Sequence, residues 1–111
     1  MILPSDIRFG DANIKEAFYK LGKGDSSEKD LFKFINQAMD NLEKNAFCGI
    51  QIPKDRIPKE YLTKYGAKNL WKYNLPNAWR IMYTIRSEEI IVISLLLEWM
   101  NHKDYNRRFK Y

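Results

Sequence analysis

One arginine stands among large apolar side chains in the second half of the chain. The segment NLWKYNLPNAWRIMYTIR spans residues 69–86, with Arg80 in its middle. A buried guanidinium without a partner is too unfavourable to keep, so Arg80 must be paired, exposed or used in a site. A guanidinium grips a phosphate through two parallel hydrogen bonds, which favours an anion as its ligand. The alternative is an ion pair with a glutamate of the same sheet.

His102 and Tyr105 are two further residues with useful chemistry. His102 is the only histidine, and an imidazole exchanges protons near neutral pH, as general acid–base catalysis requires. Its alternative role is that of a surface or helix-capping side chain. Tyr105 can stack on a base or pass on a proton, but a tyrosine in a terminal segment more often packs its ring on the core.

The chain has few residues that could bind a metal or form a disulfide. One histidine and one cysteine, Cys48, are too few for a histidine or cysteine metal cluster, so we expect no metal and no other cofactor. A single cysteine also fits a reducing compartment, and its simplest role is that of a small buried apolar side chain.

The positive charge of the chain gathers in its second half. Residues 1–52 contain 7 Lys and Arg against 8 Asp and Glu, whereas residues 53–111 contain 12 against 6. Such asymmetry favours a polyanionic partner, although a solvated surface that keeps the protein soluble would look the same. Besides Arg80, the residues that we expect to meet backbone phosphates are Arg86, Lys103, Arg107, Arg108 and Lys110.

The first half has the periodicity of two helices. The apolar stripes are Ile14, Ala17, Phe18 and Leu21, then Leu31, Phe34, Ile35, Ala38 and Leu42. Asn13 and Ser27 are the expected N-caps, and Gly22 and Gly24 close the first helix. The short link GKGDS predicts an antiparallel helical hairpin.

The second half alternates as strands do. Residues 69–75, 79–86 and 90–97 are expected to form an antiparallel meander, with turns at 76–77 and 87–89. A period of two places Trp79, Ile81 and Tyr83 on the core face and Arg80 on the other, with Lys72. We expect this second face to be open and lined with cations.

The remaining segments have weaker signals. Residues 45–68 contain two prolines, with CGIQIP as a short strand or extended turn and IPKEYLTKYG as a turn of helix ending at Gly66. Ile7–Phe9 is the one candidate for a first strand, and Asn101 is a possible cap of a last short helix. The chain therefore predicts a single α+β domain over residues 1–111 with its helices on one face.

The location expected from the sequence is the cytoplasm. The longest apolar run, 90–97, is far too short to span a bilayer, and the first ten residues lack the pattern of a secretory signal. We therefore expect no membrane partner.

These features resemble the RelE/ParE superfamily of type II toxins. The resemblance rests on the helical hairpin, the W-R-x-x-Y-x-I strand at 79–85, the apolar strand after it and the H-x-x-Y at 102–105. It implies a RelE-like fold, in which an N-terminal antiparallel helical hairpin packs on one face of a small antiparallel sheet and a short helix follows. The implied activity is metal-independent, ribosome-dependent cleavage of mRNA, in which a ribose 2′-hydroxyl attacks the adjacent phosphate.

The resemblance also implies roles for single residues. Arg80 matches a strand arginine that contacts the scissile phosphate, while His102 and Tyr105 match positions used for proton transfer or base stacking. Lys72 falls on a strand where some members carry a catalytic lysine, and Glu98 is a more distant candidate. The implied partners are a cognate antitoxin, mRNA and the ribosome, and the free protein is expected to be a monomer.

Two other functions remain open at this stage. A ParE-like protein would inhibit DNA gyrase without chemistry, and a RelE-fold relative without toxicity would bind RNA or proteins. The negative balance of the first half does not favour docking on ribosomal RNA, although Lys15, Lys20, Lys23, Lys29 and Lys33 could line one side.

Overall fold

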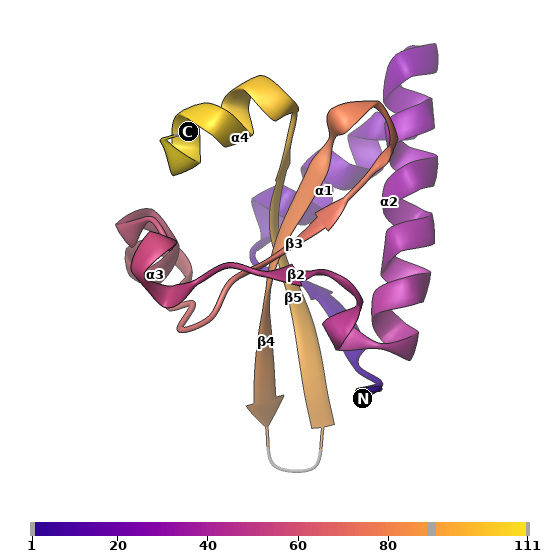
Figure 1. Ribbon diagram of the computed structural model, residues 1–111. Coiled ribbons are helices and arrows are strands. Elements are labelled where there is room, and N and C mark those ends of the chain that lie inside the picture. Colours follow the sequence, from indigo (N-terminus) through magenta and orange to yellow (C-terminus); the bar gives the residue numbers. More distant parts are fainter. Residues whose placement is uncertain (1, 89–90, 111) are drawn as a thin grey trace.

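The computed structural model describes residues 2–88 and 91–110, and within them it combines four α-helices with a five-stranded sheet (Figure 1). The strands are β1 (Asp6–Phe9), β2 (Ile50–Gln51), β3 (Trp71–Asn74), β4 (Arg80–Glu88) and β5 (Ile91–Met100). The helices are α1 (Ala12–Leu21), α2 (Ser26–Lys44), α3 (Lys59–Tyr65) and α4 (His102–Phe109). The α+β class expected from the sequence is confirmed.

The sheet is mixed, so the expected antiparallel sheet is wrong in this respect. Its order is β1-β5-β4-β3-β2, and β1 runs parallel to β5 with Asp6 opposite Ile93. The remaining neighbours are antiparallel. The expected first strand at Ile7–Phe9 does form, but a strand this short does not reveal its partner.

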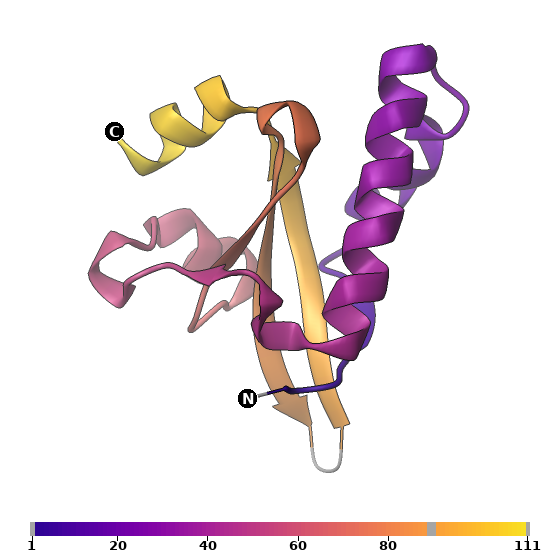
Figure 2. The ribbon, with the colours of Figure 1, turned by 45° about the vertical axis from the view of Figure 1, so that its right-hand side comes forward.

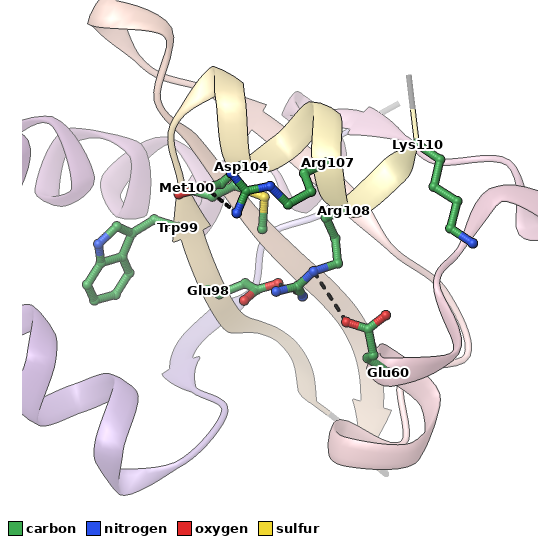
Figure 3. A pocket seen from close by; sticks show the side chains of 8 residues that line it. All are labelled: Glu60, Glu98, Trp99, Met100, Asp104, Arg107, Arg108 and Lys110. Atoms are coloured by element: carbon green, nitrogen blue, oxygen red, sulfur yellow. Dashed lines mark hydrogen bonds and ion pairs between the residues drawn. The ribbon is translucent and has the colours of Figure 1, made fainter.

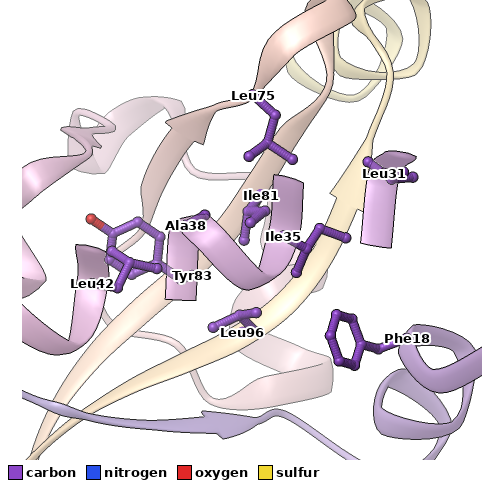
Figure 4. Close-up of a cluster of buried hydrophobic side chains, with 9 residues drawn as sticks. All are labelled: Phe18, Leu31, Ile35, Ala38, Leu42, Leu75, Ile81, Tyr83 and Leu96. Carbon is purple, nitrogen blue, oxygen red and sulfur yellow. The ribbon is translucent and has the colours of Figure 1, made fainter. Parts of the chain in front are cut away.

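One face of the sheet carries α1 and α2 (Figure 4). The core between them consists of Phe18, Leu31, Ile35, Ala38, Leu42, Leu75, Ile81, Tyr83 and Leu96. We call it the first core. Its helical members come from the apolar stripes, but α1 contributes only Phe18 as a fully buried residue, since Ile14 is half-buried and Ala17 is exposed.

The second face of the sheet is covered, so the expectation of an open face is wrong. Both ribbon views place α3 and α4 on the side of the sheet away from α2 (Figure 2). A second core lies there, formed by Ile52, Tyr61, Ala67, Leu70, Met82, Leu97, Met100 and Tyr105. Three of these residues, Ile52, Tyr61 and Ala67, belong to segment 45–68, which has little apolar periodicity.

The helix ends follow capping chemistry with a shift from the expected residues. Asp11 caps α1 and Asp25 caps α2, in place of Asn13 and Ser27. Asn101 caps α4 as expected, accepting the Asp104 N–H at 2.8 Å. α3 ends as expected at Gly66, whose φ of 64° suits a residue without Cβ. Cys48 is exposed rather than buried.

Candidate functional site

Arg80 begins β4 and lies on the second face of the sheet. Its neighbour Ile81 points into the first core, so the alternation of the strand sends Arg80 to the opposite side. The register sets Arg80 beside Met100 of β5, which belongs to the second core. The face expected for Arg80 from its period of two is confirmed, although that face is covered by α4 near this point.

The Arg80 side chain is held by a ring and a carbonyl. Its guanidinium carbon lies 4.6 Å from the centroid of the Tyr105 ring, and Nη1 donates a hydrogen bond of 2.9 Å to the carbonyl of Ala78. Nε is buried and has no hydrogen-bond partner in residues 2–88 and 91–110. No glutamate within the same residues pairs with it, so the expected alternative of an ion pair is not found there.

Lys72 points at the same ring from β3. It lies opposite Met82, one diagonal step from Arg80 on the same face, and its Nζ is 4.9 Å from the Tyr105 centroid. Within the described chain, Lys72 likewise forms no ion pair. We call Lys72 and Arg80 the cation pair. Two positive charges this close repel each other, and with no carboxylate paired to them a bound anion would offset that repulsion.

The ring of Tyr105, from α4, contacts both members of the cation pair. Its side chain is only 2% exposed, and its ring stacks on Phe109 with centroids 4.5 Å apart. The packing role considered for Tyr105 from the sequence is the one observed. In this conformation the ring is not exposed for stacking on an RNA base, and it contacts both cations instead.

His102 lies close to this cluster along the chain, and its imidazole contacts Asn106 of the same helix. It is the first residue of α4 and follows Met100, the partner of Arg80, by two positions. Its imidazole is exposed and lies 3.0 Å from the side-chain nitrogen of Asn106. The site therefore brings together Arg80, Lys72 and Tyr105 directly, while His102 is exposed at the start of α4.

The other basic candidates divide into two groups. Arg108 pairs with Glu98 at 2.8 Å and with Glu60 at 3.3 Å (Figure 3). Arg86 donates to the carbonyl of Tyr65, so both arginines fasten the fold. Lys103, Arg107 and Lys110 are exposed and follow the spacing i, i+4, i+7 along α4, which places them on one side of the helix. Within residues 2–88 and 91–110, Arg107 has one ion pair, with Asp104 at 3.9 Å.

Several residues around the site had no signal in the sequence. The carbonyl of Ala78 holds Arg80, and Ala78 itself has a left-handed φ of 63°, next to Asn77 at 60°. Tyr61 comes from the segment without periodicity, and its hydroxyl donates to Glu98. Burial raises the pKa of Tyr61 far above its ordinary value, and the hydrogen bond to Glu98 raises it further.

A cavity of about 350 Å³ opens beside α4 (Figure 3). Its walls carry carboxylates and cations together: Glu60, Glu98, Asp104, Arg107, Arg108 and Lys110, with Trp99 and Met100. Because its walls carry charges of both signs, this cavity has less preference for an anion than the cation pair has.

Neither membrane-spanning helices nor metal sites are found in the described parts of the chain. No helix there is long and apolar enough to cross a bilayer, and no three His, Cys, Asp or Glu side chains gather as a metal site would require. Comparison of the chain with protein-family models, curated proteins and solved structures finds no match.

Proposed function

We propose that the protein is a RelE-like toxin of a type II toxin–antitoxin system that cleaves mRNA on the ribosome. The observation that carries the proposal is the cation pair, in which Arg80 and Lys72 converge on Tyr105 with no ion pair in the described residues. A guanidinium and an ammonium held in this way suit the phosphate of an RNA backbone. The motif-like segments WRIMYTI and HKDY support the same function.

The reaction is an attack of the ribose 2′-hydroxyl on the adjacent phosphorus, with loss of the 5′-oxygen of the next nucleotide. A base takes the 2′-proton, and an acid gives a proton to the leaving 5′-oxygen. Arg80 and Lys72 neutralise the charge that develops on the non-bridging oxygens, which lowers the barrier without a metal. His102, exposed at the start of α4, is the residue that we assign to proton transfer.

Tyr105 has a positioning role in this scheme, because its ring is buried and lies against both cations. The exposed cations of α4, Lys103, Arg107 and Lys110, extend the positive surface and would contact backbone phosphates next to the scissile one. A cognate antitoxin would hold the toxin inactive in the cytoplasm, and the free toxin would be a monomer.

The test is a cell-free translation reaction followed by primer extension on the message. Wild-type protein should cut the mRNA within codons, and Arg80→Ala should abolish the cuts. Arg8→Ala is the matched control, because Arg8 is an exposed strand arginine of β1 and should leave cleavage intact. Uncut message with the wild-type protein, at a concentration that stops translation, would contradict the proposal.

A protein that binds RNA without cutting it is the second candidate. The burial of Tyr105 favours it, because that ring is shielded from substrate and leaves His102 as the one assigned proton carrier. RNA binding that is lost in Arg80→Ala, together with an intact message, would point to this function. Intact message with inhibited DNA supercoiling would instead point to a ParE-like gyrase inhibitor.

A further inference from the structure

A bulge in β5 brings Glu98 to the second face of the sheet. Met82 of β4 is opposite Glu98, whereas the next residue, Tyr83, is opposite Leu96. Leu97 is therefore the extra residue, and both Leu97 and Glu98 lie on the side of α3 and α4. Bulges of this kind redirect single side chains and are frequent next to active sites.

Glu98 is the centre of a charged cluster between three elements. Its Oε1 accepts hydrogen bonds from the Tyr61 hydroxyl of α3 and from Arg108 Nη1 of α4, the latter at 2.8 Å. The Glu98 side chain is 26% exposed, and the Arg108 guanidinium also lies over the Tyr61 ring at 5.8 Å. Partly buried, hydrogen-bonded pairs of this kind hold their geometry better than exposed ones do.

The cluster continues by ring stacking to the cation pair. Phe109 follows Arg108 in α4, and its ring stacks on Tyr61 at 6.2 Å on one side and on Tyr105 at 4.5 Å on another. Tyr105 in turn lies against Arg80. The position of the Arg80 guanidinium thus depends on where α4 sits, and Glu98 ties α4 to the sheet.

We propose that Glu98 is a positioning residue, which holds α4 through Arg108 so that Tyr105 fixes the cation pair. Glu98 does not touch the phosphate in this scheme. The proposal rests on the proposed function only for its effect on cleavage, since the placement of Arg80 can be measured without any substrate.

The direct test follows the Arg80 side chain by NMR in the full chain. Because the guanidinium lies over an aromatic ring, its Nε–Hε signal should carry an upfield ring-current shift that Tyr105→Leu removes. Glu98→Ala should reduce this shift by half or more, and Glu98→Gln should reduce it less. The double variant Glu98→Ala with Arg108→Ala should add little to either single change, since both act through one contact.

The matched control is Glu60→Ala. Glu60 pairs with the same arginine, but its side chain is 62% exposed, so the Arg80 signal should stay at its wild-type position. An unchanged Arg80 signal in Glu98→Ala would overturn the proposal. If Glu98→Ala fails to fold, Glu98→Gln and Arg108→Gln remove the ion pair without opening a cavity, and an unchanged signal in both would overturn it as well.

The effect on cleavage separates this inference from the proposed function. If wild-type protein cuts mRNA, Glu98→Ala should lower kcat by about tenfold with KM changed by less than about twofold, because a displaced Arg80 stabilises the transition state less. If wild-type protein cuts nothing, the proposed function fails while the NMR result still decides the role of Glu98. A shifted Arg80 signal with full kcat would contradict the positioning role.

Discussion

The guanidinium carbon of Arg80 lies 4.6 Å from the centre of the Tyr105 ring, although one residue begins a strand and the other belongs to the last helix. The face of an aromatic ring attracts a cation through its quadrupole. A carboxylate in the same place would neutralise the arginine and compete with an incoming phosphate. The ring therefore fixes the guanidinium while leaving its positive charge available.

Two replacements of Tyr105 should distinguish the contribution of its ring to RNA binding from that of its hydroxyl group. Tyr105→Phe keeps the ring over both cations, so the affinity for single-stranded RNA should stay within about twofold of wild type. Tyr105→Leu removes the ring and should weaken RNA binding by about 1 kcal/mol, or roughly fivefold. Fluorescence anisotropy with a labelled oligonucleotide measures both, and equal affinities for the two variants would show that the ring does not place the cations.

The salt dependence of RNA binding should report the number of phosphates that the cation pair meets. Each cation that contacts a phosphate of a single strand adds about 0.7 to the slope of log affinity against log salt. Lys72→Gln and Arg80→Gln should each lower the slope by about this amount. Arg8→Gln, on the exposed edge of β1, should leave the slope unchanged. A slope unaltered by either site variant would exclude phosphate contact there.

The turn before Arg80 holds backbone strain that a glycine would release. Ala78 adopts a φ of 63°, in the left-handed region where a Cβ is unfavourable. Ala78→Gly should raise the free energy of unfolding by about 0.5–1 kcal/mol, despite the extra freedom of the unfolded chain. Ala17→Gly in the middle of α1 should lower it by about 1 kcal/mol. Urea denaturation compares the two, and a loss of stability in Ala78→Gly would refute this account.

The first turn of α2 offers a test of two competing caps. The sequence favoured Ser27, but Asp25 accepts the N–H of Glu28 at 2.9 Å, and the Glu28 side chain bonds back to Asp25. Asp25→Ala should destabilise the protein by about 1 kcal/mol, and Ser27→Ala should change its stability by less than about 0.5 kcal/mol. Chemical denaturation should show this order, and the reverse order would restore the cap expected from the sequence.

The sequence predicted local structure correctly wherever its apolar pattern was regular. The alternation around Arg80 predicted its face, the apolar stripes predicted α1 and α2, and Asn101 and Gly66 were correctly placed as helix ends. The cap positions were off by two residues because aspartate and asparagine or serine serve equally well, and only the packing of the helix decides between neighbours.

The sequence did not predict the contacts between segments that are far apart in the chain. The parallel pairing of β1 with β5 joins segments far apart in the chain, and no short-range pattern specifies it. The second core was missed because Ile52, Tyr61 and Ala67 lie in a proline-containing segment without a regular apolar pattern. As a result, the site was expected on an open sheet, whereas α4 covers it and supplies the ring that holds its cations.

Alkaline pH should destabilise the protein through Tyr61. Burial and the hydrogen bond to Glu98 raise the pKa of this phenol in the native state above its unfolded value of about 10. Below about pH 10 the phenol is protonated in both the folded and the unfolded state, so Tyr61 makes its full contribution to the free energy of unfolding. Above that pH the unfolded form loses its proton first, and stability falls by up to about 1.4 kcal/mol per pH unit.

Tyr61→Phe cannot ionise and should escape this loss. The stability difference between wild type and Tyr61→Phe, measured by urea unfolding, should therefore move in favour of the variant between about pH 9 and about pH 11. Tyr19→Phe is the matched control, because Tyr19 is 53% exposed on α1 and its replacement should leave the wild-type pH dependence in place. A parallel decline of wild type and Tyr61→Phe would mean that burial and the hydrogen bond to Glu98 do not raise the pKa of this phenol in the native state.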